Sequence, residues 1–334
     1  MKVLLTGGTG FIGANVVRRL LARGDTVRCA LRSASPGLCL EGLDVERVQL
    51  DLGDGEALRR ALDGVEGVYH LAGVFDPSPG GRALMEAVHV DATRSLCDAA
   101  LDVGVRRLVL CSSSVTVGFG SLNSPGNEDT PFEDLDGVYG VDGPLRWYYD
   151  TKLRSEQLAR SYVARGLETV IVNPDYIVGA WDIKPTSGAL IATMCKRWVP
   201  VYPRGGKCFQ DAEDCADGHI LAMLRGTPGR RYLLGNENLS YREFMGIVAE
   251  VAGVRAPVLP MPRMVSEVAG LVGAVGSRFD AHRFAGLDRY VLRSVAQARY
   301  RDGRRAVDEL GVPRTPIREA VEKAVRWFRD HGYC

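Results

Sequence analysis

The first 175 residues alternate between two kinds of hydrophobic pattern. Short runs rich in aliphatic and β-branched residues predict strands at Lys2–Thr6, Thr26–Leu31, Arg47–Leu50, Gly67–Leu71, Arg107–Ser112 and Thr169–Val172. The segments between them place apolar residues three and four positions apart and predict helices at Ala14–Arg23, Gly55–Ala61, Leu84–Val103 and Leu145–Ala164. This alternation is typical of a parallel sheet whose strands are joined by crossover helices. We therefore expect an α/β fold with a doubly wound parallel sheet.

After the last of these strands the regular alternation ends. Proline- and glycine-rich connections separate mostly helical segments, with one further strand predicted at Arg231–Leu234. We expect residues 1–175 to form the larger domain, which also receives residues 205–235. A smaller, mostly helical lobe is expected from residues 176–204 and 236–334.

Composition and charge exclude several classes of protein. The chain has 334 residues, of which 46% are hydrophobic and 25% charged, which excludes disorder and collagen. Its 42 basic residues are balanced by 41 acidic ones, so no nucleic-acid partner is expected. The most apolar later segment, Val265 to Val275, is too short and too interrupted to cross a membrane. We expect no transmembrane segment, and we predict an amphipathic helix over a pocket at that segment.

The cysteines and the first residues indicate a reducing compartment. None of the eight cysteines forms a Cys-x-x-Cys pair, so we expect no metal site and interpret them as small buried apolar residues. The chain opens directly into Val3-Leu4-Leu5, without the long apolar region of a secretory signal. The sequence therefore favours a cytoplasmic location.

A glycine-rich turn, Thr6-Gly7-Gly8-Thr9-Gly10-Phe11-Ile12-Gly13, follows the first predicted strand and leads into a helix. Gly7 permits a tight turn, Gly10 allows the backbone to approach a pyrophosphate, and Gly13 allows the helix to pack closely on the strand. The backbone N–H groups that open the helix, including those of Phe11 and Ile12, are donors for an anion. We interpret the turn as a dinucleotide site; a glycine-rich turn without a ligand is the alternative.

The end of the second predicted strand indicates which dinucleotide is bound. NAD-binding folds usually carry an acidic residue there, whereas this chain reads Leu31-Arg32-Ser33. The guanidinium of Arg32 suits a bidentate contact with a 2′-phosphate, so we expect NADP(H) to be favoured over NAD(H); a solvated Arg32 is the alternative. The ends of the third and fourth strands are expected at the adenosine end of the cofactor, although ordinary turns also explain their residues: Asp51, Leu52, Leu71, Ala72 and Gly73.

Tyr148 and Lys152 lie four positions apart near the start of a predicted helix, so they share one face and are one turn apart. The chain has only six lysines, which makes this spacing more specific. An ammonium group beside the phenol is expected to lower the pKa of Tyr148 from about 10 toward neutrality. Tyr148 is then a usable proton donor or acceptor at pH 7. An exposed helix with an ordinary tyrosine and lysine is the alternative.

Ser112-Ser113-Ser114 follows the fifth strand, where hydroxyl groups would face the cofactor. Together, the glycine-rich turn, these serines and the Tyr148-x-x-x-Lys152 spacing resemble the extended short-chain dehydrogenase/reductase superfamily over nearly the whole chain. Within it, the sequence looks like the dihydroflavonol-reductase branch and its bacterial relatives, including hopanoid-associated epimerase-like proteins. Further segments that carry these likenesses are Thr26-Val27-Arg28, Leu31-Arg32, Val105 to Val109, Trp147-Tyr148, Ser155 to Ala159, Thr169 to Gly179 and Glu309 to Pro313.

The resemblance implies a Rossmann-type fold and a mechanism. A nicotinamide delivers a hydride to a carbonyl carbon, Tyr148 protonates the carbonyl oxygen, and a serine forms a hydrogen bond with that oxygen. Counting along the family pattern places this serine at Ser113, with Ser114 as the alternative. The resemblance further implies that Lys152 binds the nicotinamide ribose and that Pro174 flanks the nicotinamide.

Two positions depart from the family's usual pattern. His89 stands where the family has an asparagine, and a structural role and a part in proton relay are both open for it. Phe209–Asp214 replaces a His-Val-Asp-Asp run of related proteins, which indicates altered pocket or interface chemistry. Arg32 agrees with the pattern, since the matching arginine of such reductases holds the NADP phosphate. Homodimers are common in the superfamily, so a homodimer is one state that the resemblance allows.

Three functions are compatible with these residues. We favour an NADPH-dependent reductase of a small apolar or aromatic ketone, because of Arg32, the catalytic set and the aliphatic segment Met261 to Val275. The alternative is a nucleotide-sugar epimerase or dehydratase with tightly held NAD(H), which Arg32 disfavours. A dinucleotide-sensing protein without turnover is less favoured, because Ser113, Tyr148 and Lys152 are all present.

Overall fold

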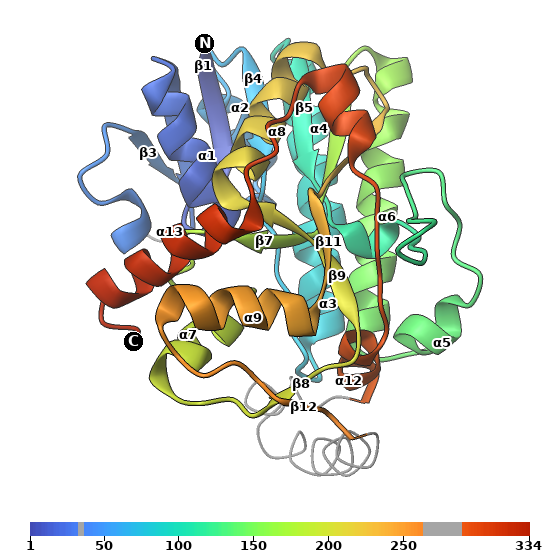
Figure 1. The fold of residues 1–334 in the computed structure, drawn as a ribbon. Coiled ribbons are helices and arrows are strands. Elements are labelled where there is room, and N and C mark those ends of the chain that lie inside the picture. Colours follow the sequence, from blue (N-terminus) through green and yellow to red (C-terminus); the bar gives the residue numbers. More distant parts are fainter. Residues whose placement is uncertain (33–36, 263–288) are drawn as a thin grey trace.

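The computed structural model describes residues 1–32, 37–262 and 289–334, and a seven-stranded parallel sheet lies at its centre (Figure 1). The strand order is β10-β6-β5-β4-β1-β2-β3. The strands are β1 (Lys2–Thr6), β2 (Thr26–Leu31), β3 (Glu46–Gln49), β4 (Gly67–His70), β5 (Arg107–Cys111), β6 (Glu168–Pro174) and β10 (Arg231–Leu234). All seven expected strands are present, which confirms the Rossmann-type α/β fold.

Helices cover both faces of this sheet. α1 (Phe11–Ala22) and α8 (Ala212–Arg225) pack on one face. α2 (Gly55–Ala61), α4 (Ala92–Asp102) and α6 (Pro144–Ser161) pack on the other. Successive residues of a strand point to opposite faces, so Val3 and Leu5 join the core under α1, and Leu4 joins the core under α2. This two-sided burial explains why the strands read as short continuous apolar runs.

The helix expected over Leu84–Val103 is interrupted. It consists of α3 (Gly81–Glu86), a π-helical turn η2 (Ala87–Asp91) and α4. Such turns widen a helix locally and are frequent at functional sites. The remaining short elements of this part are α5 (Leu135–Tyr139) and the 3₁₀ turns Leu38–Leu40, Ser114–Thr116 and Val163–Arg165.

The described chain after residue 175 contains more strands than expected. β7 (Tyr176–Val178), β9 (Gly206–Asp211) and β11 (Glu237–Ser240) form one sheet, and β8 (Val201–Tyr202) pairs with β12 (Leu259–Pro260). The other elements are α7 (Ala189–Lys196), α9 (Tyr241–Ala252), α12 (Arg289–Ala296), α13 (Ile317–Asp330) and a π-helical turn, Ala306–Leu310. The expectation of a single strand after residue 175 was therefore wrong. These strands are short, and all four residues of β11 are half-buried, so no hydrophobic pattern marks it.

Most of the cysteines are buried, as the sequence predicted. Six of the eight cysteines are buried, whereas Cys195 is half-buried and Cys334 is exposed, so burial was wrong for Cys334. In the described ranges, no helix is long and apolar enough to span a bilayer. The helix expected at Val265 to Val275 lies outside the described residues. Since α8 and β10 join the large sheet, we propose that the chain returns to the larger domain through them.

Candidate active site

The turn between β1 and α1 leaves no room for a side chain at two of its glycines. Gly7 has a φ of +76°, and a Cβ atom there would lie 2.6 Å from the carbonyl group of Leu71. A Cβ atom on Gly13 would lie 2.1 Å from the carbonyl oxygen of Gly7. Glycine is therefore required at both positions, because the ends of β1 and β4 approach the start of α1 so closely.

The N-terminus of α1 is open to an anion. Its N-cap is Gly10, which provides no side-chain cap, and its first turn contains no acidic residue. The N–H groups of Phe11, Ile12 and Gly13 precede that of Ala14, the first to donate within the helix, so they stay available as donors at the positive end of a twelve-residue helix. The glycine-rich turn and this open terminus together fit the pyrophosphate of a nicotinamide dinucleotide.

The other residues expected to bind the cofactor follow neighbouring strands. Because all seven strands are parallel, their carboxyl ends lie at one edge of the sheet. Arg32 follows β2 at this edge and is exposed. Asp51 follows β3 and accepts a hydrogen bond from the Gly53 N–H at 2.9 Å, so its carboxylate already supports its own turn. The same edge carries Leu52, Leu71, Ala72, Gly73 and Pro174.

α6 brings Lys152 to this edge. The lysine is 5% exposed, and its Nζ donates to the carbonyl oxygen of Cys111, the last residue of β5, at 3.0 Å. A Cβ atom on Gly73 would lie 3.3 Å from Nζ, so the glycine leaves the space that the ammonium group occupies. Lys152 is thus held between the ends of β4 and β5.

Tyr148 and Ser113 are the more accessible members of the expected catalytic set. The ring of Tyr148 is half-buried and meets Phe75 and His89 edge-on, at centroid distances of 5.7 and 5.5 Å. Ser113 is also half-buried, and its Oγ accepts a hydrogen bond from the Val115 N–H at 3.2 Å. Ser114 is only 6% exposed, so the burial favours Ser113 as the serine that a substrate contacts.

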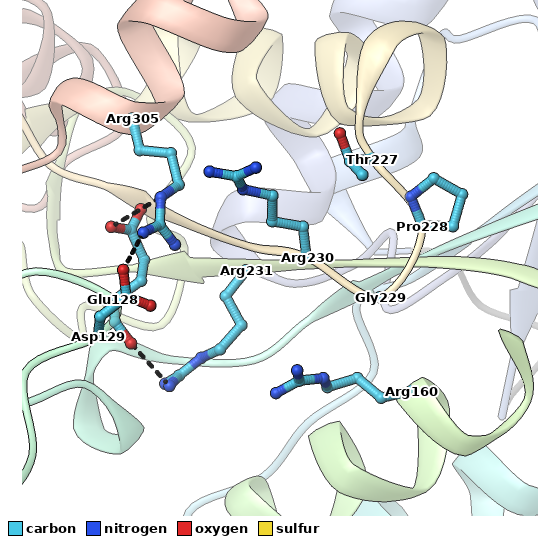
Figure 2. A pocket seen from close by; sticks show the side chains of 9 residues that line it. All are labelled: Glu128, Asp129, Arg160, Thr227, Pro228, Gly229, Arg230, Arg231 and Arg305. Atoms are coloured by element: carbon cyan, nitrogen blue, oxygen red, sulfur yellow. Dashed lines mark hydrogen bonds and ion pairs between the residues drawn. The ribbon is translucent and has the colours of Figure 1, made fainter.

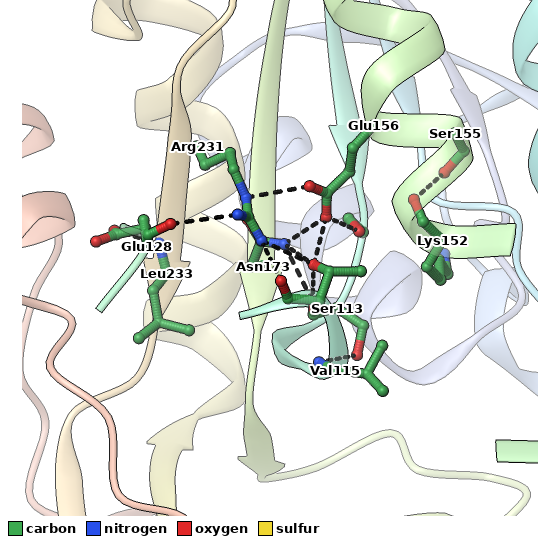
Figure 3. A network of polar contacts seen from close by, with 11 residues as sticks. Ser113, Val115, Glu128, Lys152, Ser155, Glu156, Asn173, Arg231 and Leu233 are labelled. Atoms are coloured by element: carbon green, nitrogen blue, oxygen red, sulfur yellow. Dashed lines mark hydrogen bonds and ion pairs between the residues drawn. The ribbon is translucent and has the colours of Figure 1, made fainter. Parts of the chain in front are cut away.

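A buried carboxylate links α6 to the segment after β5 (Figure 3). Glu156 is 2% exposed and accepts hydrogen bonds from the hydroxyls of Ser112 and Thr116 and from the Asn173 amide. The guanidinium of Arg231, on β10, lies 3.1 Å from its other oxygen. Charge-assisted hydrogen bonds of this kind are stronger than neutral ones, so the network is rigid.

The same network fixes the backbone of Ser113. The Asn173 amide donates a second hydrogen bond, to the carbonyl oxygen of Ser113 at 3.0 Å, and the Thr116 hydroxyl lies 2.9 Å from the same oxygen. Glu156 therefore acts on Ser113 through these two side chains and is a positioning residue. No role was predicted for Glu156 from the sequence. Its position four residues after Lys152, on the same helix face, could have indicated one.

His89 lies in the π-helical turn and is 2% exposed. Its Nε2 accepts a hydrogen bond from the Val74 N–H at 3.1 Å, and its Nδ1 lies 2.8 Å from the Thr151 hydroxyl. Burial, and then the nearby Lys152 ammonium, lower the pKa of His89 to about 2. The same causes lower the pKa of His70 to about 3. A neutral His89 with both ring nitrogens engaged favours the structural role over proton relay.

An ion pair connects the later part of the chain to the site. Arg301 and Asp175, whose side chains are 1% and 2% exposed, approach to 2.8 Å. Asp175 directly follows Pro174, and Arg301 also donates to the carbonyl oxygens of Val117 and Gly118. Arg301 thus holds two segments that border the candidate site. Sequence patterns did not indicate this pair, because its members lie 126 residues apart.

A polar cavity of about 360 Å³ lies at the far end of α6 (Figure 2). It is lined by Arg160, Arg230, Arg231 and Arg305 together with Glu128 and Asp129. Tyr148 and Arg160 are twelve residues apart on α6, about 18 Å along the helix axis. α6 runs antiparallel to the strands that it follows and precedes, so Arg160 lies toward the amino edge. This cavity is therefore not where a substrate meets Tyr148.

Comparison with known proteins agrees with this geometry. Residues 3–235 match the model of the NAD dependent epimerase/dehydratase family. A putative dihydroflavonol 4-reductase from Synechocystis sp. is 34% identical, over 98% of this chain and 95% of the relative. Sterol demethylase protein B from Methylococcus capsulatus is 35% identical, over 99% of both chains. The crystal structure of a nucleoside-diphosphate-sugar epimerase from Pseudomonas aeruginosa is similar with a TM-score of 0.78 and 26% identity, over 100% of this chain and 99% of the other.

The matched region contains the glycine-rich turn, the serine segment after β5 and the Tyr148-x-x-x-Lys152 helix. The two relatives extend the likeness through the smaller lobe. The geometry and the similarity thus describe an oxidoreductase that depends on a nicotinamide dinucleotide. The chain belongs to the NAD dependent epimerase/dehydratase family, within the extended short-chain dehydrogenases/reductases.

Proposed function

We propose that the protein is an NADPH-dependent carbonyl reductase. The observation that carries this proposal is the arrangement on α6. Lys152 is anchored to the end of β5, Tyr148 lies one turn away, and Glu156 fixes the segment that bears Ser113. A phenol, a hydroxyl and an ammonium group at the carboxyl edge supply a proton, a hydrogen bond and a positive charge, which reduction of a carbonyl group requires.

Each side chain has a distinct part in this reaction. When bound, the nicotinamide supplies the hydride that the carbonyl carbon accepts. Tyr148 gives its proton to the carbonyl oxygen, and the Ser113 hydroxyl stabilises the negative charge that develops there. The Lys152 ammonium supplies a positive charge one helical turn from Tyr148, and it is suited to bind the nicotinamide ribose. Pro174 ends β6 at the same edge and would flank the nicotinamide of a bound cofactor.

The surroundings of Tyr148 support an apolar or aromatic substrate. Phe75 is 39% exposed and meets the Tyr148 ring edge-on. An exposed aromatic side chain beside the proton donor offers an apolar surface to a substrate body. The names of two relatives, a dihydroflavonol reductase and a sterol demethylase protein, agree with a substrate of this class.

The cofactor preference is tested by titration calorimetry with NADPH and NADH on protein stripped of bound nucleotide. We expect NADPH to bind at least tenfold more tightly, about 1.4 kcal/mol, because Arg32 takes the place of the usual acidic residue. The preference should disappear in Arg32→Ala and persist in Arg23→Ala, an exposed arginine before β2, at the opposite end of that strand. Equal binding of NADH to the unmodified protein contradicts the preference.

The catalytic assignment is tested with Tyr148→Phe and a panel of aromatic and alicyclic ketones. NADPH oxidation should fall by roughly a hundredfold or more, because general acid catalysis is worth about that factor. Calorimetric binding of NADPH should be unchanged. Unaltered function in the variant would instead support a dinucleotide-sensing protein without turnover.

The nucleotide-sugar epimerase or dehydratase remains the second candidate, and one observation favours it. The structure of a nucleoside-diphosphate-sugar epimerase is similar over the whole chain. This function requires NAD(H) that stays bound through turnover. Purified protein that retains NAD(H) and converts a UDP-sugar, without reducing any ketone of the panel, would establish it over the reductase.

A further inference from the structure

Arg299 is a buried cation, and two of its guanidinium nitrogens have no hydrogen-bonding partner among the described residues. The residue is 3% exposed, and within the described ranges its Nε and Nη2 form no hydrogen bond. The guanidinium carbon lies 5.2 Å from the ring centroid of Phe119 and 5.3 Å from that of Tyr139. Aromatic faces stabilise part of the charge but leave the N–H groups unsatisfied. Burial lowers the pKa of Arg299, yet an arginine remains charged in proteins.

The two free nitrogens form the side of the guanidinium that binds carboxylates elsewhere in this protein. Arg19 donates from Nε and Nη2 to the two oxygens of Asp217, at 2.8 and 2.6 Å. Nε and Nη2 of Arg107 likewise contact the carboxylate of Glu168. Two parallel N–H groups match a planar anion with two oxygens. Arg299 presents this pair with no protein carboxylate opposite it among the described residues.

Positive charge exceeds negative charge around Arg299. Asp175 is already paired with Arg301 at 2.8 Å. Lys207 lies on β9 next to Gly206, whose carbonyl oxygen accepts the Arg299 N–H at 3.0 Å. Burial, together with the Arg299 and Arg301 cations, lowers the pKa of Lys207 to about 7, although Asp175 acts in the opposite direction. An added anion would therefore restore the full charge of Lys207.

A series of contacts connects Arg299 to the candidate catalytic residue Ser113. Tyr139, whose ring lies beside Arg299, donates from its hydroxyl to the carbonyl oxygen of Val115 at 3.0 Å. The Val115 N–H in turn donates to the Ser113 hydroxyl. Tyr139 also stacks on Tyr149, the residue after Tyr148. Two intervening residues thus separate Arg299 from Ser113.

We propose that Arg299 and Lys207 bind a carboxylate of the substrate, at a separate position from the carbonyl group that is reduced. This inference rests on the proposed reductase function and narrows its substrate class to carbonyl compounds whose apolar or aromatic body carries a carboxylate. Nε and Nη2 of Arg299 hold the two oxygens, and Lys207 supplies a second positive charge. The anion gives the buried guanidinium the partner that the described chain does not provide.

Matched pairs of carbonyl compounds test the proposal. We would measure kcat/KM for NADPH oxidation with 4-acetylbenzoate and 3-(4-acetylphenyl)propanoate, each against its methyl ester. We expect at least a tenfold preference for the acids, lost in Arg299→Gln and kept in Arg197→Gln, an exposed arginine of the same lobe. Esters reduced as well as the acids, or a preference that survives Arg299→Gln, would overturn the inference while leaving the reductase function intact. If no acid and no ester is reduced, the proposed reductase function fails.

A binding measurement separates the inference from turnover. Benzoate is titrated calorimetrically into the NADP⁺-saturated protein at pH 7.5, in two buffers of different ionisation enthalpy. We expect proton uptake on binding, because Lys207 gains its proton among Asp175, Cys208, Arg299 and Arg301. The uptake should vanish in Lys207→Gln, and affinity should fall at least tenfold in Arg299→Gln. Benzoate that binds Arg299→Gln unchanged, or UDP that binds through Arg299 while benzoate does not bind, overturns the proposal.

Folding of the variants is checked in the same preparations. Arg299 has no hydrogen-bonded partner to lose among the described residues, so Arg299→Gln should unfold thermally at a temperature no lower than the unmodified protein. A clear fall in that temperature would show that Arg299 supports the structure and would count against a binding role.

Discussion

Two buried charges border the candidate site, and the protein treats them differently. The carboxylate of Glu156 is surrounded by three hydrogen-bond donors and a guanidinium. The guanidinium of Arg299 is equally deep, but two of its nitrogens have no acceptor in the described chain. Burying a charge costs free energy that partners must offset. The comparison teaches that a paired charge fixes the geometry of this site, whereas an unpaired one is available to a ligand.

The largest effect is expected when the paired charge of the comparison, the Glu156 carboxylate, is removed. Glu156→Ala removes the carboxylate opposite Arg231 and one of the acceptors of the buried Asn173 amide. We expect the free energy of unfolding to fall by about 4 kcal/mol, as for other broken buried pairs. Urea denaturation measures this loss. Glu156→Gln, which keeps an acceptor, should lose less; equal losses would mean that packing rather than hydrogen bonding matters here.

Acid introduces unpaired charges at three buried histidines outside these two regions. The folded pKa values of His70, His89 and His219 are lowered to about 3, 2 and 4, whereas the unfolded value is about 6.5. Below pH 6.5 these histidines are therefore protonated in the unfolded chain but remain neutral in the folded chain. The free energy of unfolding is thus highest above pH 6.5 and decreases as the pH falls below it. Between pH 7.5 and 5.5 we expect a loss of about 1.4 kcal/mol per histidine, about 4 kcal/mol together.

Urea denaturation at the two pH values measures the acid effect. His89→Asn removes one titrating group and should reduce the loss by about a third. An unchanged loss in this variant would show that His89 is not among the groups responsible.

A milder change weakens the second ion pair of the site. Asp175→Asn removes the negative charge opposite Arg301 but keeps an oxygen that accepts its hydrogen bond. We expect a loss of about 2 kcal/mol in unfolding free energy, within the range for hydrogen bonds to charged groups. Differential scanning calorimetry can detect it. No loss would indicate that Val117 and Gly118, the other acceptors of Arg301, are sufficient.

The smallest expected effect has the opposite sign. Arg299→Leu replaces an unpaired guanidinium with an apolar side chain beside Phe119 and Tyr139. We expect stability to rise by about 1 kcal/mol, since removal of an uncompensated buried charge is favourable. The same substitution at Arg301 should destabilise the protein. A loss at Arg299 similar to that at Arg301 would erase the distinction between the two regions.

The parts of the fold that could be predicted are those with strong local patterns. β1 and β2 are buried on both faces, so their apolar runs predicted their bounds without error. β11 is Glu237-Asn238-Leu239-Ser240, half-buried throughout, and β8 and β12 have two residues each. Such strands exist because of their partners, and those partners are distant in the sequence.

The same division applies to the site. Gly7 and Gly13 could be predicted because backbone geometry alone requires them, and the spacing of Tyr148 and Lys152 because one helix carries both. The partners of Glu156 come from β5, β6 and β10, so only the fold brings them together. The lack of an acceptor for Nε and Nη2 of Arg299 results from tertiary packing, so no spacing of residues in the sequence could predict it.

The Arg301–Asp175 ion pair also has a consequence for biosynthesis. Asp175 leaves the ribosome 126 residues before its partner is added. The first six strands of the large sheet can assemble in the nascent chain during that interval, since domains fold from the N-terminus as they emerge. The segment after Pro174 nevertheless lacks its counter-charge until Arg301 arrives. Completion of the candidate site is therefore a late event of translation, after most of the molecule has been made.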